Sequence, residues 1–431
     1  AANAFKSWRR TSAGKRARIL EAWYRLQLEH VRDLARLLTL EQGKPLSEAI
    51  GEIRYGASFV EWFKEEARRV YGDVIPSHGH DKRIITIKQP VGVVAAITPW
   101  NFPSAMITRK VAPALAAGCT VVLKPAEDTP LSALALAYLA QEAGFPPGVF
   151  NVITTADPEA VGKELCRNPL VRKLSFTGST RVGKLLAEQC AGTVKKVSLE
   201  LGGNAPFIVF DDADLDAAVE GALASKYRNA GQTCICANRL FAQQGIYNAF
   251  VERLSQAAAA QQVGNGLVEG TRIGPLINSA ALDKVEELVA DAVSQGARVL
   301  TGGRSLDQGP LFYAPTVIAD ARREMRMFEA EIFGPVAAVY QFQSEEEVIG
   351  MANDTPWGLA AYFYGRDHAR IWRVAEALEY GMVGINTGMI STPVAPFGGV
   401  KESGIGREGS KYGIDEFVEI KYLCWGGLDR K

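Results

Sequence analysis

The sequence predicts an α/β protein with two blocks of alternating strands and helices. In the first block, short apolar runs such as 91–97 and 120–123 are separated by alanine-rich stretches of helical length such as 104–117. Short buried strands that alternate with helices are typical of a parallel sheet. A second block with the same alternation begins after the Leu-Gly-Gly sequence at 201–203. We therefore expect two α/β domains that meet there.

Two segments flank or interrupt these blocks. Residues 1–70 predict helices, because their apolar residues recur at helical spacing; the last of these helices is expected from about 46 to 70. The β-rich run 83–88 predicts a hairpin that projects from the body, and the alternating run 417–423 predicts a lone edge strand. Because exposed strand edges can pair between subunits, we expect this hairpin to be a subunit contact.

The composition argues against several classes of protein. The 431 residues carry 48 basic and 48 acidic side chains, and this balance disfavours nucleic acid or an anionic membrane as a partner. Six dispersed cysteines indicate a reducing compartment, which we expect to be the cytoplasm, or the mitochondrial matrix in a eukaryote. The sequence offers no zinc-type cysteine pair, no secretory signal and no apolar run of the roughly 18 residues that span a bilayer.

A glycine-rich stretch with two thiols, 230–236, lies just after the midpoint of the chain. Cys234 is flanked by polar residues and glycine, so it belongs to a loop or a helix edge, where a thiol can meet a substrate. A small buried side chain is the equally weighted alternative, since free cysteine is often buried. The four histidines lie outside glycine-rich or apolar motifs, so a cysteine–histidine pair has poor support. A glutamate is the better candidate for a base.

Four more polar residues stand in settings that suit acyl chemistry. Glu200 ends an apolar strand; burial there would raise its pKa toward that of a general base, unless it faces solvent. Asn101 lies in a proline-bounded turn and could donate to an oxyanion, or bind its own backbone. Arg109 and Arg228 are single basic residues in apolar helical segments. Each could hold a substrate carboxylate or form a structural ion pair.

Two loops after strands are candidate cofactor sites. The glycine-flanked turn 178–183 opens a helix, whose first N–H groups could hold a phosphate, although a plain tight turn is as plausible. Lys124 and Glu127 follow a parallel strand, where open α/β sheets bind ligands, and could grip ribose hydroxyls. The alternative for this pair is a solvated loop.

Seven short motifs occur together in one order. They are Pro-Trp-Asn-Phe-Pro at 99–103, Lys-Pro-Ala-Glu at 124–127, Phe-Thr-Gly-Ser at 176–179, Leu-Glu-Leu-Gly-Gly at 199–203, Gly-Gln-Thr-Cys at 231–234, Glu-Ile-Phe-Gly-Pro at 331–335 and Pro-Phe-Gly-Gly at 396–399. In this order they resemble the aldehyde dehydrogenase superfamily, from about Phe5 to the C-terminus. The stretches 225–238 and 406–413 are most similar to its succinate-semialdehyde dehydrogenase group.

The resemblance implies a role for each candidate residue. Cys234 would be the nucleophile, Glu200 the general base and Asn101 the side-chain donor of the oxyanion hole. Residues at positions that bind the cofactor would be Trp100, Lys124, Glu127, Gly178, Ser179, Gly183, Glu331 and Phe333. Residues that hold the distal carboxylate of the substrate would be Arg109, Arg228 and Ser391.

The resemblance also implies a reaction. It is the NAD(P)-dependent oxidation of succinate semialdehyde to succinate, through a cysteine thiohemiacetal and a thioacyl-enzyme, with no metal. Glu127 favours NAD, because a carboxylate repels the 2′-phosphate of NADP, while Lys124 leaves NADP possible. The alternatives are a glutarate-semialdehyde or other aldehyde dehydrogenase, a CoA-acylating relative, and a non-catalytic scaffold protein.

The same resemblance implies the domain organisation. We expect a Rossmann-type NAD-binding domain at 1–71 and 91–201, a catalytic domain at 202–402, and an oligomerisation hairpin and strand at 72–90 and 417–431. By analogy with the family, the hairpin and strand would join subunits into a homodimer or homotetramer. Relatives usually start earlier, so residues of the cofactor domain are expected before Ala1.

Cys236 carries a second hypothesis. It lies two residues from Cys234 and could form a disulfide with it under oxidation, which would switch the enzyme off. So close a pairing requires the loop to move. An inert neighbour is the alternative.

Overall fold

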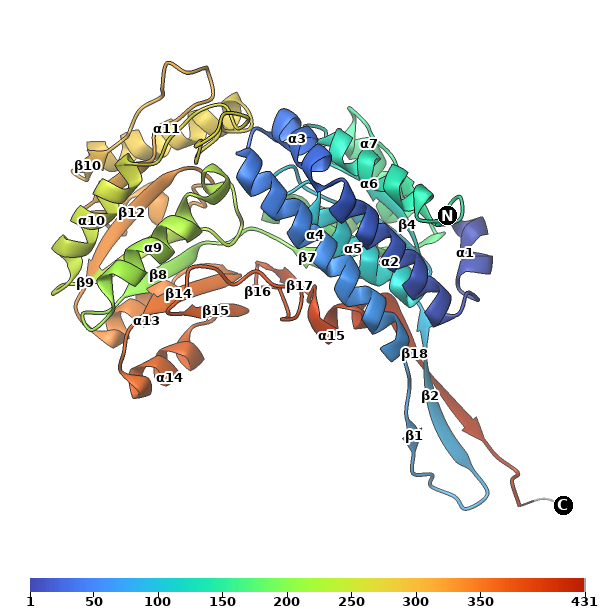
Figure 1. The fold of residues 1–431 in the computed structure, drawn as a ribbon. Coiled ribbons are helices and arrows are strands. Elements are labelled where there is room, and N and C mark those ends of the chain that lie inside the picture. Colours follow the sequence, from blue (N-terminus) through green and yellow to red (C-terminus); the bar gives the residue numbers. More distant parts are fainter. Residues whose placement is uncertain (430–431) are drawn as a thin grey trace.

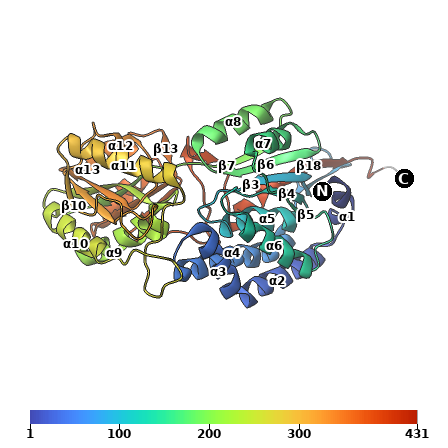
Figure 2. The same ribbon diagram turned by 90° about the horizontal axis from the view of Figure 1, so that it is seen from above.

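A computed structural model gives the fold of residues 1–429, and its two large sheets and one small projecting sheet confirm the predicted α/β class (Figure 1). Seen from above, each large sheet with its helices forms one lobe, and the two lobes lie next to each other (Figure 2). Within the described residues, no helix combines the length and the apolar character needed to cross a membrane.

The first large sheet has six strands in the order β17-β7-β6-β3-β4-β5. Its parallel strands are β3 (Val93–Ile97), β4 (Thr120–Lys124), β5 (Phe150–Val152), β6 (Val171–Thr177) and β7 (Lys196–Glu200). Their connecting helices are α5 (Ala105–Ala117), α6 (Pro130–Glu142), α7 (Pro158–Arg167) and α8 (Thr180–Ala191). The edge strand β17 (Gly404–Ile405) returns from far along the chain and pairs antiparallel with β7.

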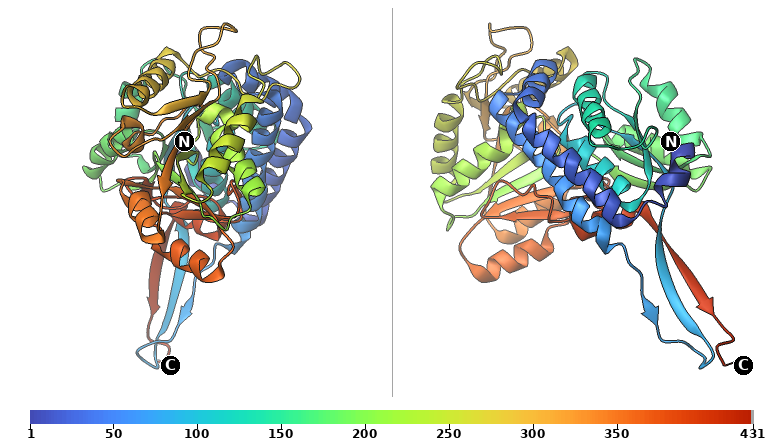
Figure 3. Two further views of the ribbon diagram at one scale, coloured as in Figure 1. Left: turned by 90° about the vertical axis from the view of Figure 1, so that its left-hand side faces the viewer. Right: turned by 45° about the vertical axis from the view of Figure 1, so that its right-hand side comes forward.

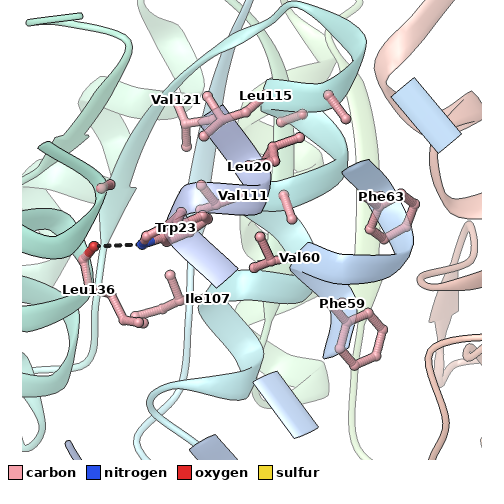
Figure 4. Packing of buried hydrophobic residues seen from close by; sticks show 14 of the residues in the cluster. Leu20, Trp23, Phe59, Val60, Phe63, Ile107, Val111, Leu115, Val121 and Leu136 are labelled. Atoms are coloured by element: carbon pink, nitrogen blue, oxygen red, sulfur yellow. Dashed lines mark hydrogen bonds between the residues drawn. The ribbon is translucent and has the colours of Figure 1, made fainter. Parts of the chain in front are cut away.

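The N-terminal segment is helical, and most of its helices pack against α5 and α6 on one side of this sheet. They are α1 (Ala2–Trp8), α2 (Ala13–Glu29), α3 (Val31–Gln42), α4 (Leu46–Glu66) and the 3-10 turn η1 (Ala67–Arg69). Trp23 of α2 packs into the shared core and donates its indole N–H to the carbonyl of Leu136 at 3.0 Å (Figure 4). Satisfying the one polar group of a buried tryptophan lets its large apolar surface stabilise the packing.

The second large sheet has seven strands in the order β10-β11-β12-β9-β8-β14-β15. They are β8 (Ala205–Val209), β9 (Ala237–Gln243), β10 (Arg298–Thr301), β11 (Thr316–Ala319), β12 (Val336–Phe342), β14 (Ala360–Tyr364) and β15 (Met382–Ile385). Only β10 runs antiparallel to its neighbour. Its helices are α9 (Leu215–Lys226), α10 (Tyr247–Ala259), α11 (Ser279–Ser294), α12 (Arg326–Glu329), α13 (Glu345–Asn353) and α14 (His368–Ala377).

Several short elements complete the fold of the described residues. They are the 3-10 turns η2 (Arg228–Gly231) and η3 (Asp415–Phe417), the helix α15 (Ser410–Gly413), and the strands β13 (Trp357–Gly358) and β16 (Val400–Lys401), which pair with each other. Between β16 and β17, the hydroxyl of Ser403 donates to the carbonyl of Gly202 at 2.7 Å. This bond fastens the returning chain to the junction between the lobes.

The third sheet projects from the body as an arm (Figure 3). It consists of β1 (Val74–Ile75), β2 (Arg83–Pro90) and β18 (Val418–Trp425). The predicted lone strand at 417–423 was therefore wrong in one respect, because β18 pairs with β2 along its whole length. Sequence periodicity identifies a strand but not a partner from the other end of the chain. Residues 430 and 431 of the predicted arm lie outside the described residues.

Candidate active site

A cavity of about 260 Å³ lies at the carboxyl ends of strands in the first sheet, where parallel α/β sheets bind ligands. Both lobes contribute to its wall. The lining includes these residues predicted from the sequence: Trp100, Asn101, Gly178, Ser179, Cys234, Glu331 and Phe333. It does not include Lys124, Glu127, Gly183, Glu200, Arg109, Arg228, Ser391 and Cys236.

The loop before Cys234 has a tightly bent backbone. Asn229, Ala230 and Gly231 all adopt left-handed conformations, with φ of 52°, 55° and 75°. This region is costly for alanine, and strain of this kind often occurs at functional sites. A side chain on Gly231 would put its Cβ 2.1 Å from the carbonyl oxygen of Gly334, so only glycine fits there. The bend leads into Cys234, which is half-buried in the cavity wall.

The thiol of Cys234 is held in its neutral form. Burial raises its pKa to about 12, while Arg109 acts in the opposite direction. A neutral thiol is a poor nucleophile. In this state of the site, Cys234 therefore needs a base to remove its proton.

Asn101 faces the same loop. It is 4% exposed, and its side-chain N–H₂ donates to the carbonyl of Gln232 at 3.0 Å. The side chain therefore does not form a hydrogen bond within its own turn, which was the alternative expected from the sequence. An amide N–H₂ has two hydrogens. The bond to Gln232 fixes the amide beside Cys234 and leaves the second hydrogen for another acceptor.

Glu200 is the last residue of β7 and is buried at 4% exposure. Neither carboxylate oxygen has a hydrogen-bond partner within residues 1–429. Its pKa is raised well above the usual value, first by burial and then by the charge of Glu408, against the pull of Arg109. This is the setting that the sequence predicted for a general base, and the role itself stays a prediction.

The two glycines after Glu200 permit the main chain there to lie close to Cys234 and Glu331. A Cβ at Gly203 would lie 2.7 Å from the carbonyl oxygen of Cys234, and one at Gly202 would lie 3.0 Å from Glu331. The N–H of Gly203 donates to Glu331 at 3.2 Å. Burial raises the pKa of Glu331 to about 7, so this carboxyl is partly protonated at neutral pH.

The two arginines lie in different electrostatic settings. Arg109 is buried, and its Nε lies 2.5 Å from Glu408, so it forms the structural ion pair that was the alternative for it. Its Nη2 has no hydrogen-bond partner within residues 1–429. Arg228 is half-buried, with its guanidinium 5.2 Å from the centre of the Phe102 ring. Among the described residues, no carboxylate forms an ion pair with it.

Tyr55 is a further titratable group near these residues, and sequence reasoning missed it. Burial raises the pKa of Tyr55, whereas Arg109, Arg228 and Ser391 lower it. Tyr55 lies on α4, whose apolar pattern indicates only a core residue. Glu408, which pairs with both Arg109 and Lys110, was missed as well.

The residues predicted to bind a dinucleotide fall into three groups. Trp100 and Phe333 pack edge to face at 5.7 Å in the cavity wall. Gly178 and Ser179 precede α8, where Ser179 caps the helix by accepting from the N–H of Val182 at 3.4 Å. Lys124 and Glu127 form an ion pair with each other after β4. Aromatic walls, helix N–H groups and paired charges suit a nicotinamide ring, a phosphate and ribose hydroxyls.

Gly183 and Cys236 are two of the predicted residues that do not line the cavity. Gly183 is buried inside α8, where a Cβ would lie 2.3 Å from Leu201, so it serves close packing of the helix. Cys236 is 6% exposed, and its thiol donates to the carbonyls of Lys226 and Ala237, each at 3.5 Å. All six cysteines are unpaired.

Known proteins resemble this chain over nearly its whole length. Residues 1–423 match the model of the "Aldehyde dehydrogenase family". The chain is 64% identical over 423 residues to an NADP(+) succinate-semialdehyde dehydrogenase of Escherichia coli, covering 98% of this chain and 88% of the relative. It is also 64% identical over 425 residues to a glutarate-semialdehyde dehydrogenase of Pseudomonas aeruginosa, covering 99% and 88%.

A solved structure also matches this chain over nearly its whole length. The succinate-semialdehyde dehydrogenase of Burkholderia pseudomallei has a TM-score of 0.98 and 60% identity to this chain, with 99% of this chain and 88% of that one covered. Family match, relatives and fold therefore agree over nearly the whole sequence, and the chain belongs to the aldehyde dehydrogenase family.

Proposed function

We propose that this aldehyde dehydrogenase oxidises succinate semialdehyde to succinate. The proposal rests on the guanidinium of Arg228. It has no carboxylate ion pair among residues 1–429, and its charge lowers the pKa of both Tyr55 and Cys234. A half-buried cation close to the nucleophile suits an aldehyde with a distal carboxylate. The names of the E. coli and B. pseudomallei relatives support this substrate.

The chain's own residues divide the work as follows. Arg228 and the free Nη2 of Arg109 orient the carboxylate of the substrate. The Cys234 thiol gives its proton to solvent water in the cavity that it lines, and its sulfur bonds to the carbonyl carbon, while Asn101 donates to the resulting oxyanion. A bound nicotinamide cofactor supplies the hydride acceptor. Glu200 then takes a proton from water, whose oxygen displaces the sulfur and releases succinate.

A substrate comparison tests the proposal. We expect kcat/KM for succinate semialdehyde to exceed that for butanal, which has the same carbon number but no carboxylate, by about 100-fold, as charge-assisted hydrogen bonds allow. Equal values would contradict it. A higher kcat/KM for glutarate semialdehyde, which is one methylene longer, would instead favour the activity named for the P. aeruginosa relative.

We infer a preference for NAD over NADP. The exposed carboxylate of Glu127 follows β4, where it can accept from a ribose hydroxyl and repel a 2′-phosphate. Its ion pair with Lys124 weakens this repulsion, and the E. coli relative is named for NADP(+). Measuring kcat/KM for both cofactors with succinate semialdehyde decides the matter, and a higher value for NADP would overturn the inference.

Replacing Arg228 with methionine is expected to separate substrate binding from chemistry. KM for succinate semialdehyde should rise about 10- to 100-fold, the worth of a charge-assisted hydrogen bond, whereas the kinetics with butanal should change little. The control is Arg253→Met, which removes an arginine from an exposed ion pair with Asp216. If both aldehydes were affected equally, Arg228 would not recognise the carboxylate.

We also propose that the arm joins subunits into a homodimer or homotetramer. Val74 on β1 is 80% exposed, and Ile420 and Trp425 on β18 are 70% and 66% exposed. A narrow β-arm with large apolar side chains in solvent is suited to pairing with a second subunit. The mass of the protein in solution checks this, and a monomer at micromolar concentration would contradict it.

Cys236 stays a proposed redox partner of Cys234. Hydrogen peroxide would oxidise the two thiols to a disulfide and be reduced to two molecules of water. Because the Cys236 thiol is turned toward the Lys226 carbonyl, the loop must rearrange first. We expect inactivation by peroxide to be reversed by dithiothreitol in the parent and to become largely irreversible in Cys236→Ala, measured as recovered activity. Full recovery in the variant would count against the switch.

A further inference from the structure

A fully buried ion pair lies directly behind Asn101 and takes no part in the chemistry described so far. Lys44 follows α3, and Glu52 lies on α4; their side chains are 0% and 1% exposed, with Nζ 2.5 Å from the carboxylate. Burying two charges is expensive unless all of their hydrogen-bonding capacity is used. The remaining contacts of the pair therefore indicate its purpose.

Those contacts converge on the turn that carries Asn101. The ammonium of Lys44 donates to the main-chain carbonyl of Asn101 at 2.7 Å and lies 3.9 Å from the centre of the Phe102 ring. The second carboxylate oxygen of Glu52 accepts from the N–H groups of Ser104 and Ala105, at 2.9 and 3.2 Å. Together the two side chains hold the main chain from 101 to 105.

A second layer of bonds connects the same carbonyl to the nucleophile loop. The side-chain N–H₂ of Asn229 donates to the carbonyls of Asn101 and Gln232, at 3.0 and 3.1 Å. Gln42 donates to the side-chain oxygen of Asn229 at 3.0 Å and accepts from the N–H of Lys44 at 2.9 Å. The carbonyl of Asn101 is thus shared by an ammonium and by the loop that leads to Cys234.

We propose that Lys44 and Glu52 are positioning residues for catalysis, which act by fixing the Asn101 amide at the distance from Cys234 that oxyanion stabilisation requires. The inference rests on the proposed function, since it assumes that Asn101 donates to the oxyanion. Oxyanion donors work because they are aimed before the charge develops. A rigid backbone at 101 provides that aim, because the amide has only two side-chain torsions of its own.

The test is a double-mutant cycle with Lys44→Met and Asn101→Ala. Methionine keeps the length and apolar stem of lysine but removes the ammonium. In the parent background we expect Lys44→Met to slow the first turnover of succinate semialdehyde about 100-fold, the cost of a displaced catalytic group. In the Asn101→Ala background the side-chain amide is absent, so its position no longer matters. We therefore expect Lys44→Met to lower the rate of the first turnover less than about threefold there.

A second measurement separates positioning from general damage. Alkylation of Cys234 by iodoacetamide is a displacement at saturated carbon and forms no oxyanion, so its rate should change less than about twofold in Lys44→Met. The matched control is Lys195→Met. Lys195 also donates to main-chain carbonyls, those of Val171 and Asn168, but lies away from the cavity, and its removal should cost the same in both backgrounds.

Three results would overturn the proposal. Equal losses from Lys44→Met with and without Asn101, or a parallel loss of alkylation, would assign the ion pair a structural role only. Full turnover in Asn101→Ala would overturn the oxyanion role of Asn101 itself, a failure of the proposed function that the single variant reveals separately. If Lys44→Met fails to fold because Glu52 is left unpaired, the variant Lys44→Met/Glu52→Gln removes both charges and enters the same cycle.

Discussion

Replacing Cys234 with alanine is expected to lower kcat for aldehyde oxidation by about 10⁴-fold or more, because no other group can form the covalent intermediate. Cys234 is half-buried in the cavity wall, and its pKa of about 12 shows that the folded protein does not depend on a charged sulfur there. The fold should therefore survive the change. The measurement is the formation of reduced cofactor, with the thermal unfolding temperature as a check on folding.

The matched control is Cys424→Ala, which removes an exposed thiol on β18 of the arm. Its activity should equal that of the parent. A Cys234→Ala variant that is folded and keeps a tenth of the parental kcat would refute the assignment of the nucleophile. Alkylation supplies a further check, because the raised pKa of Cys234 implies that its modification becomes faster as pH rises toward 12.

Replacing Glu200 with glutamine is expected to lower steady-state kcat by about 10²- to 10⁴-fold while leaving one fast turnover. The first half of the reaction ends with the thioester on Cys234, and only its hydrolysis needs the carboxylate to take a proton from water. We therefore expect a burst of reduced cofactor, at most one per active site, followed by a slow phase. Rapid-mixing absorbance measures both phases.

The pH dependence distinguishes this role from a structural one. The pKa of Glu200 is raised well above the usual value, so the carboxylate is protonated and inactive at low pH, and parental kcat should rise with pH through this value. Glu200→Gln should lose that rise. The control Glu346→Gln, at an exposed position on α13, should keep it. A Glu200→Gln variant without a burst would move the role of the residue to the first half-reaction.

The same shift makes a statement about stability. Between the usual pKa of a glutamate and the raised value, the folded state binds more protons than the unfolded state, so the free energy of unfolding contributed by Glu200 falls as pH rises. Glutamine carries no such penalty. Glu200→Gln should therefore unfold at a higher temperature than the parent at pH 8, with a smaller difference at pH 5.

The parts of the site that the sequence predicted are those whose signal is local. Asn101 and Cys234 each lie in a short motif whose turn or loop follows from proline and glycine nearby. The bond that the Asn101 amide donates to the carbonyl of Gln232, and the bond that the Asn101 carbonyl accepts from Asn229, then bring the two motifs together. The alternation of apolar runs and helices likewise identified the α/β class, since it depends on spacing within each segment.

The parts of the site that could not be predicted from the sequence depend on partner residues far along the chain. Arg109 stands out as a lone charge, but its bond to Glu408 depends on a turn after β17 that reaches α5. In the sequence, Lys44 is only a residue that follows a predicted helix. The hydrogen bond from its ammonium to the carbonyl of Asn101 becomes visible only in the folded chain.

The return of the chain at β17 has a consequence for biosynthesis. The strand that carries Glu200 has an unpaired edge until Gly404 and Ile405 pair with it. In the same way, one edge of β2 in the arm stays unpaired until β18 has been made. Until the chain has been made past Ile405, the edge of β7 beside Glu200 has no strand to pair with. Unpaired edges invite wrong partners. Because β17 follows all the other strands of both large sheets in the chain, its pairing with β7 closes this edge only after those strands have been made.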